Sequence, residues 1–138
     1  MNLLERRRAL MMQVKKKSKN LFNASLIPSN TYITNNGDGS FSVKGGAQSR
    51  NTYMSLQELC PDLKVGDVAT LSGVSNGGKR IAVKTLWSFG ATKTVTQEML
   101  DADVYFYTTS SSTSSQVYTV SNIQIELGTE ATEYEPYY

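Results

Sequence analysis

From Asn20 onward the chain is a succession of short runs in which apolar and polar residues alternate, separated by turn-forming residues. A period of two places successive side chains on opposite faces, which is typical of half-buried β-strands. Seven or eight such runs follow one another at fairly even spacing, with almost no helical pattern between them. The pattern predicts an all-β domain over residues 20–138, built as an antiparallel β-sandwich or barrel.

The clearest pair of runs occupies residues 66–89, GDVATLSGVSNGGKRIAVKTLWSF. Asn76 and Gly77 suit the positive φ angles of a type I′ turn, so the two runs are predicted to form a hairpin. Four side chains of its second arm share a face that is predicted to be core: Ile81, Val83, Trp87 and Phe89. A second hairpin is predicted at residues 103–120, where eight consecutive Ser and Thr residues form a polar loop between DVYFY and QVYTV.

Two local sequence signals predict a turn and a short helix between the strands. The segment NNGDGS carries Asn-Gly and Asp-Gly and predicts a turn before SFSVK, whose Phe41 and Val43 share a face. Ser55 is followed three residues later by Glu58, which matches a capping box. A single helical turn is therefore expected there, ended by Pro61.

The closing run predicts a half-buried strand followed by an extended tail. Its alternating apolar residues, Ile123, Ile125 and Leu127, are predicted to face the core, and Gln124 and Glu126 the solvent. The tail TEATEYEPYY has no period, and it either packs back on its own sheet or meets a neighbouring subunit. We favour the neighbour, because three aromatic side chains are more than a free terminus normally exposes: Tyr134, Tyr137 and Tyr138.

The composition restricts the chemistry. There is no histidine, which excludes the usual zinc, copper and haem ligand sets and any Ser-His or Cys-His nucleophile. The single cysteine, Cys60, excludes an internal disulfide and is expected to fill space. Glu98, Asp101 and Asp103 lie close in sequence but are better explained as solvated acids than as a glycosidase pair. We expect no enzyme and no cofactor; calcium is the one metal whose oxygen ligands the chain offers, without EF-hand spacing.

The formal charge of +2 is unevenly distributed, since seven of the fourteen basic residues lie in the first nineteen positions. Residues 1–19 lack Gly and Pro and are predicted to form a basic amphipathic helix. A lone helix of this length is marginal in water, so it should dock on its own body or on a partner. The predicted anchoring residues are Leu3, Leu4, Arg7, Leu10, Met11 and Val14.

Several roles stay open for this helix. It could carry a solvated charged face, anchor a protein partner, or touch a membrane surface or nucleic acid. Nucleic acid is disfavoured because no aromatic residues interleave the basic ones. The apolar run is too short for a signal peptide or a membrane span.

Four segments carry a resemblance to a known family: KNLFNASL, NGDGSFSVKGGAQSRNTYMSL, VGD…TLSG and NIQIELGTEATEYEPY. They resemble a module of bacteriophage and prophage tail, baseplate and fibre proteins of Gram-positive bacteria, which is similar to jelly-roll carbohydrate-binding modules of the galactose-binding type. The resemblance covers about residues 20–137. It implies a jelly-roll β-sandwich in a virion component, commonly oligomeric and sometimes concerned with host-surface sugars.

In that family the module is one segment of a longer protein, whereas here only the basic helix precedes it. We therefore expect a small accessory piece that attaches to other virion proteins of a tail, baseplate or head and is assembled in the host cytoplasm. The resemblance supplies no sugar-contacting residues. Exposed aromatic rings are the candidates for stacking on sugars: Tyr53, Trp87, Tyr105, Tyr107 and Tyr118. Tyr105 and Tyr107 should point away from Val104 and Phe106, and Trp87 is favoured as core.

Overall fold

The computed structural model describes residues 2–7, 17–108 and 115–138, and these residues are mostly β-structure. The strands are β1 (Ile33–Asn35), β2 (Phe41–Lys44), β3 (Ser49–Ser55), β4 (Val68–Ser75), β5 (Arg80–Val83), β6 (Trp87–Ser88), β7 (Thr92–Thr94), β8 (Asp103–Tyr107) and β9 (Val117–Leu127). The assigned helices are short: η1 (Ala24–Leu26), α2 (Leu56–Leu59) and α3 (Gln97–Asp101). The predicted all-β class is confirmed.

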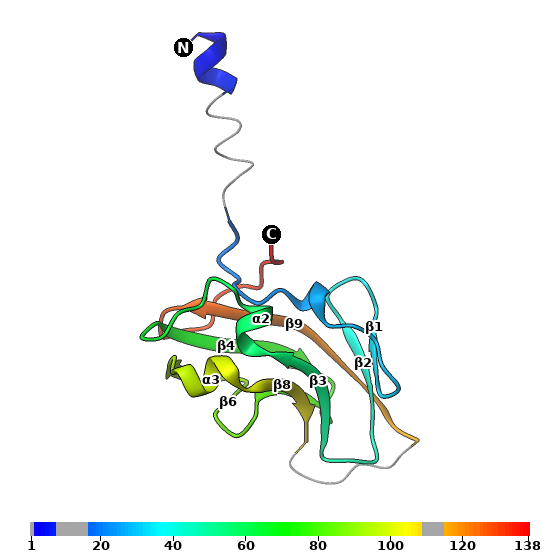
Figure 1. The fold of residues 1–138 in the computed structure, drawn as a ribbon. Helices are drawn as coiled ribbons and strands as arrows, with labels where there is room; N and C mark the ends of the chain where they lie inside the picture. The colour runs from blue at the N-terminus through cyan, green and yellow to red at the C-terminus, as the bar shows by residue number, and fades with distance from the viewer. Residues whose placement is uncertain (1, 8–16, 109–114) are drawn as a thin grey trace.

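The strands form two antiparallel sheets. The first sheet has the order β1-β2-β9-β4-β7, and the second has the order β3-β8-β5-β6 (Figure 1). The sheets face each other: the ring of Phe41 in the first lies 5.3 Å, centroid to centroid, from the ring of Phe106 in the second. This arrangement is consistent with the predicted β-sandwich.

The core lies between the two sheets and follows the sequence alternation. Phe41 and Val43 are both buried, as their spacing predicts. Of the face predicted in residues 81–89, the members Ile81, Val83 and Trp87 are buried and Phe89 is partly buried against the core. Cys60 is also buried, and its burial raises the pKa of the thiol well above the ordinary value. The lone cysteine therefore fills space, as expected.

The predicted hairpin of residues 66–89 is wrong, and although the chain bends at residues 76–78, Asn76 lacks the positive φ that the predicted type I′ turn needs. Gly77 has a φ of 106°, but β4 and β5 belong to different sheets. The end of β4 pairs instead with β9, where Val74 lies opposite Ser121. The Asn76 side chain stabilises this crossing, since its Oδ1 accepts a hydrogen bond from Thr119 N at 3.0 Å. A turn signal identifies the reversal of the chain and not the partner of the strand.

The second predicted hairpin fails for the same reason. The strand β8 is in the second sheet and β9 is in the first, so the two strands joined by the Ser/Thr loop do not pair. Most of that loop, residues 109–114, lies outside the described residues. Hairpins between consecutive strands are instead β1 with β2, around the predicted NNGDGS turn, and β5 with β6.

The predicted helical turn after β3 is confirmed in α2. Ser55 Oγ accepts a hydrogen bond from Glu58 N at 3.1 Å, and Glu58 Oε1 accepts one from Ser55 N at 3.1 Å. We expect Ser55→Ala to lower the free energy of unfolding by about 1 kcal/mol, because the Glu58 amide loses its side-chain acceptor. Urea denaturation measures this loss. A change no larger than that of Gln57→Ala, an exposed residue of the same turn, would contradict it.

The closing strand departs from its predicted pattern at three positions. Gln124 and Glu126, expected to face solvent, are 0% and 4% exposed, whereas Leu127, expected in the core, is 60% exposed. The tail causes the first difference because it folds back over these two polar side chains. Glu135 N donates to Gln124 Oε1 at 2.9 Å, and Thr132 Oγ1 donates to Glu126 Oε1 at 2.6 Å. Leu127 is exposed because it ends the strand, next to Gly128.

The N-terminal segment is helical over residues 3–7. Asn2 and Glu5 cap this turn reciprocally: Glu5 N donates to Asn2 Oδ1 at 2.9 Å, and Asn2 N donates to Glu5 Oε2 at 3.2 Å. Residues 17–19, which the prediction included in the helix, are not helical, and Lys17 pairs with Asp62 at 2.8 Å. Residues 8–16 lie outside the described part of the chain.

Candidate functional site

The outer face of the second sheet carries a hollow beside β8. Along β8, Val104 and Phe106 point into the core and Tyr105 and Tyr107 are partly exposed on the other side, as the alternation predicts. The two tyrosine rings meet edge to face, with centroids 6.2 Å apart and planes at 80°. Such a pair presents aromatic surface next to phenolic hydroxyl groups, the combination that sugars require.

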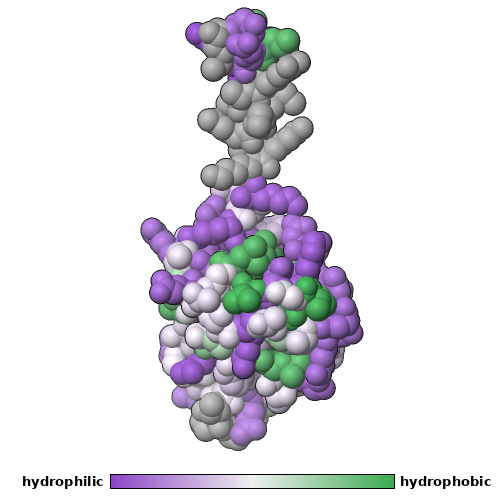
Figure 2. Space-filling model, turned by 90° about the vertical axis from the view of Figure 1, so that its left-hand side faces the viewer, coloured by the Kyte–Doolittle hydropathy of each residue, from purple (hydrophilic) through white to green (hydrophobic). Residues whose placement is uncertain are grey.

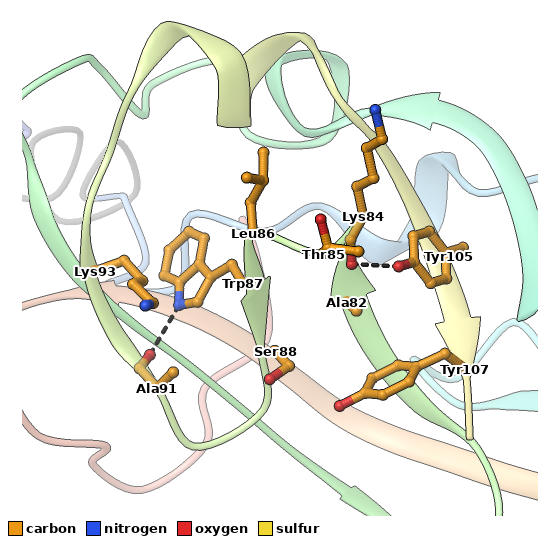
Figure 3. Close-up of a pocket in the computed structure, with 10 residues that line it drawn as sticks. All are labelled: Ala82, Lys84, Thr85, Leu86, Trp87, Ser88, Ala91, Lys93, Tyr105 and Tyr107. Carbon is orange, nitrogen blue, oxygen red and sulfur yellow. Dashed lines mark hydrogen bonds between the residues drawn. The ribbon is translucent and has the colours of Figure 1, made fainter. Parts of the chain in front are cut away.

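The tyrosine pair forms one side of a hollow of about 370 Å³, with Trp87 and Lys93 on the other side (Figure 3). Its floor and rim come from the β5–β6 hairpin and the loop that follows. The lining residues are Ala82, Lys84, Thr85, Leu86, Trp87, Ser88, Ala91, Lys93, Tyr105 and Tyr107. We call this the tyrosine hollow.

The Tyr105 hydroxyl group is held in place by the hairpin. It donates a hydrogen bond to the backbone oxygen of Lys84, a residue with a φ of 49°. Burial raises the pKa of Tyr105, and the neighbouring Tyr107 adds to the effect. The hydroxyl group therefore stays protonated at neutral pH and keeps its role as a donor. This contact fixes one wall of the tyrosine hollow.

Trp87 does not offer the ring face that a stacking candidate needs. Its side chain is only 2% exposed, and its Nε1 donates to Ala91 O at 2.8 Å. The ring contributes to the wall of the tyrosine hollow while most of it packs in the core, so the core role favoured from the sequence is confirmed.

Two ammonium groups border the tyrosine hollow. Lys84 and Lys93 both line it, and neither Nζ forms a hydrogen bond or ion pair with the described residues. They are therefore available to donate to the hydroxyl or carboxyl oxygens of a bound molecule. The sequence pattern did not single them out, because lysines in and after turns are common on any surface.

A second hollow, of about 550 Å³, adjoins the first and shares Lys84 and Tyr105 with it. It contains Asp101 and Asp103, two of the acids weighed above; Glu98 is not among its lining residues. Both carboxylates already accept amide hydrogen bonds, Asp103 from Asn51 at 3.1 Å and Asp101 from Gln97 at 2.9 Å. We call this the acidic hollow.

The described residues contain no group of three or more acidic or cysteine side chains placed to hold a metal ion. The possible calcium site therefore stays a prediction without a location. Within the same residues, no helix is long and apolar enough to cross a membrane.

Tyr53 and Tyr118 lie at two separate places. Tyr53 is 77% exposed and lines a third hollow of about 400 Å³ at the β3 edge. Tyr118 is in β9, in the other sheet, where its hydroxyl group donates to Gln116 at 2.6 Å and its ring covers Gly78. The sequence candidates therefore divide: Tyr53, Tyr105 and Tyr107 share the second sheet, and Tyr118 does not.

The residues predicted to contact partners are only partly described. Leu3 and Leu4 are 67% and 57% exposed, and Arg7 is exposed too. Three further predicted anchors lie outside the described residues: Leu10, Met11 and Val14. In the tail, Tyr134 and Tyr137 are half-buried and Tyr138 is 63% exposed. The tail packs on its own sheet, the first of the two alternatives, and it leaves part of its aromatic surface exposed, so contact with a neighbouring subunit stays a prediction.

Comparison with protein-family models, with curated proteins and with solved structures finds no match for this chain. Its function therefore has to be inferred from the fold and the side chains described above.

Proposed function

We propose that this chain is a non-enzymatic structural component of a bacteriophage particle, attached through its N-terminal segment and displaying a jelly-roll body. The nested pairing of the strands is the main observation that supports this proposal. The strand β2 pairs with β9, β3 with β8, β4 with β7, and β5 with β6. Eight strands paired in this way are one long antiparallel ribbon that has been rolled up, which is the jelly-roll plan of many viral capsid and lectin domains. The resemblance of residues 20–137 to phage modules points the same way.

Attachment through the N-terminal segment is supported by its exposed apolar residues. Leu3 and Leu4 lie on a helical turn, more than half exposed, beside the basic Arg6 and Arg7. An isolated helical turn is unstable in water, and apolar side chains gain free energy when a partner covers them. A larger virion protein is the partner we propose.

Deletion of residues 1–19 tests this attachment. We expect the truncated chain to keep its β-sheet circular dichroism and lose incorporation into phage particles, measured by immunoblot of purified particles. Leu3→Ser with Leu4→Ser should reproduce most of the loss. Arg6→Gln with Arg7→Gln is the matched control for charge alone. Normal incorporation of the folded truncated chain would exclude an anchoring role.

Contacts between copies, or with other virion proteins, are supported by exposed apolar groups elsewhere on the body. Val65, Val68 and Leu127 are exposed, at the start of β4 and the end of β9. Figure 2 shows that side of the molecule, with apolar residues exposed among polar ones. Tyr134, Tyr137 and Tyr138 of the tail are the further contacts that we propose for a symmetric homo-oligomer.

A second candidate function is recognition of host-surface glycans, and the tyrosine hollow favours it. Its edge-to-face tyrosine pair, free lysines and Ser88 combine aromatic surface with hydrogen-bonding groups. We expect Tyr107→Ala to weaken binding of the best ligand on a glycan array about tenfold, the value of one aromatic contact. Tyr107→Phe, which keeps the ring, should bind nearly as wild type. Equal binding by Tyr107→Ala and the wild type would exclude the tyrosine hollow as the glycan site.

A further inference from the structure

Tyr53 is held in a backbone conformation that costs free energy. Its φ is 59°, in the left-handed region that a bulky residue rarely adopts, and its side chain is 77% exposed. An exposed ring gains little from packing, so packing does not offset the strain. Strain of this kind concentrates where a side chain is presented to a ligand.

A double bulge in β3 imposes this conformation. Asn51 lies opposite Tyr105 and Met54 lies opposite Val104, so two residues of β3 are inserted between adjacent positions of β8. The first, Thr52, turns inward and is 1% exposed, and its hydroxyl group bonds the backbone oxygen of Val104. The second, Tyr53, is turned outward, and its N–H donates to Asn51 Oδ1 at 2.8 Å. Bulges commonly re-aim a side chain in this way.

Tyr53 borders a hollow with a second aromatic residue. Tyr32 is 47% exposed, and the guanidinium carbon of Arg50 lies 3.8 Å from its ring centroid. Arg50 is fixed in turn by Lys44 O, which accepts from its Nε at 3.1 Å. This hollow, lined by residues 30–32, 49–51 and 53, thus has two rings and several amide and hydroxyl groups. We call it the edge hollow.

The three hollows adjoin one another along the second sheet. The tyrosine and acidic hollows share Lys84 and Tyr105, and the acidic and edge hollows share Ser49 and Asn51. The sheet order β3-β8-β5-β6 spaces the outer strands about 14 Å apart, from three strand separations. Tyr53 on β3 lies one strand away from the Tyr105–Tyr107 pair on β8, and the tyrosine hollow extends past that pair to Trp87 on β6. A track of that length is longer than one sugar ring.

We propose that this track binds a linear neutral oligosaccharide of several sugars, with Tyr53 as a second stacking anchor on the strand next to the Tyr105–Tyr107 pair. Neutrality is inferred from the mixed charges of the lining, in which Asp101 and Asp103 lie beside Lys84 in the middle and Lys93 and Arg50 line the two flanking hollows. An anionic chain would meet those carboxylates, whereas sugar hydroxyl groups can donate to them and accept from the lysine. The inference rests on the glycan-recognition function proposed above and adds the length and charge of the ligand.

The experiment uses the full chain on an array of monosaccharides and linear neutral oligosaccharides of up to six sugars, built from glucose, galactose, mannose or N-acetylglucosamine. Titration calorimetry then follows the best binder and its shorter homologues. We expect the longest chains to bind at least tenfold more tightly than the monosaccharide. Tyr53→Gly should remove that gain and leave the weak binding of the short sugars unchanged, whereas Tyr53→Phe should retain it.

Thermal unfolding of the same variants separates a binding role from a structural one. Glycine accepts a positive φ without strain, so Tyr53→Gly should melt at or above the temperature of the wild type. Binding that is independent of chain length, or unchanged by Tyr53→Gly, would overturn the extended track and leave glycan recognition at the tyrosine hollow standing. No binding to any sugar of the array would overturn both.

Discussion

Replacing Phe106 by alanine is expected to lower the free energy of unfolding by about 3–5 kcal/mol. Phe106 is 0% exposed and lies on β8, which pairs with β3 on one side and β5 on the other. Its ring meets that of Phe41 in the opposite sheet. Truncation therefore opens a cavity between the two sheets, at the point where they are in contact.

Urea denaturation at neutral pH measures this effect. Phe106→Leu is the matched control, because it keeps an apolar side chain of similar size and should cost less than about 1.5 kcal/mol. A loss below about 1 kcal/mol for Phe106→Ala would mean that the two sheets do not share one core, and the described packing would be wrong.

Replacing Glu126 by alanine is expected to cost about 2–3 kcal/mol, because its carboxylate satisfies donors that are withdrawn from water. It accepts hydrogen bonds from Thr132 N, from Thr132 Oγ1 and from Gln124 Nε2, the last at 2.5 Å. Without it, the fully buried Gln124 amide loses one partner and the tail loses the Thr132 part of its attachment to β9. Glu133→Ala, an exposed acid of the same tail, should change stability by less than about 0.5 kcal/mol.

The Glu126 contacts also predict a pH dependence. Burial by itself raises the pKa of this carboxyl group, but the Thr132 and Gln124 hydrogen bonds and the charge of Lys19 outweigh it, so the net pKa is lowered. A carboxyl group with a lowered pKa in the folded state stabilises fully above its unfolded value, about 4.3, and loses that contribution as the pH falls through the folded value.

Urea midpoints measured between neutral pH and about pH 3 test this dependence. The wild type should lose more stability over the acid range than Glu126→Gln, which carries no titrating group at this position. Equal losses would show that Glu126 does not hold the tail in the way described.

Local features of the fold could be predicted from the sequence because short-range forces determine them. The alternation in SFSVK and DVYFY gave the correct inward residues, and Ser55 with Glu58 gave the capped turn. Strand pairing could not be predicted in the same way. Asn76 and Gly77 make a turn whether the next strand pairs with the last one or crosses to the other sheet, and tertiary packing decides between these outcomes.

The buried Gln124 and Glu126 illustrate the second limit. Their polar side chains predict exposure to solvent, and burial is allowed only because the tail returns and supplies hydrogen bonds from residues 6 and 11 positions further along the chain. An extended, aperiodic segment gives no sign of where it will dock.

The candidate site shows the same division between local features, which the sequence predicts, and features that depend on tertiary packing. The outward orientation of Tyr105 and Tyr107 was predicted correctly because it depends only on the two-residue period of the strand. The sequence also named Tyr53, but its strained backbone and its hollow depend on a double bulge against β8. Lys84 and Tyr32 join the site from loops and Lys93 joins it from β7 of the other sheet, and their positions follow from the packing of the two sheets.

The most direct test of the proposed virion role is the copy number of this chain in phage particles, measured by quantitative mass spectrometry of particles purified on a density gradient. We predict a fixed number of copies per particle, equal to the number of symmetry-related attachment positions and constant between preparations. Absence of the chain from intact particles, or an amount that varies and falls away on further washing, would contradict the proposal.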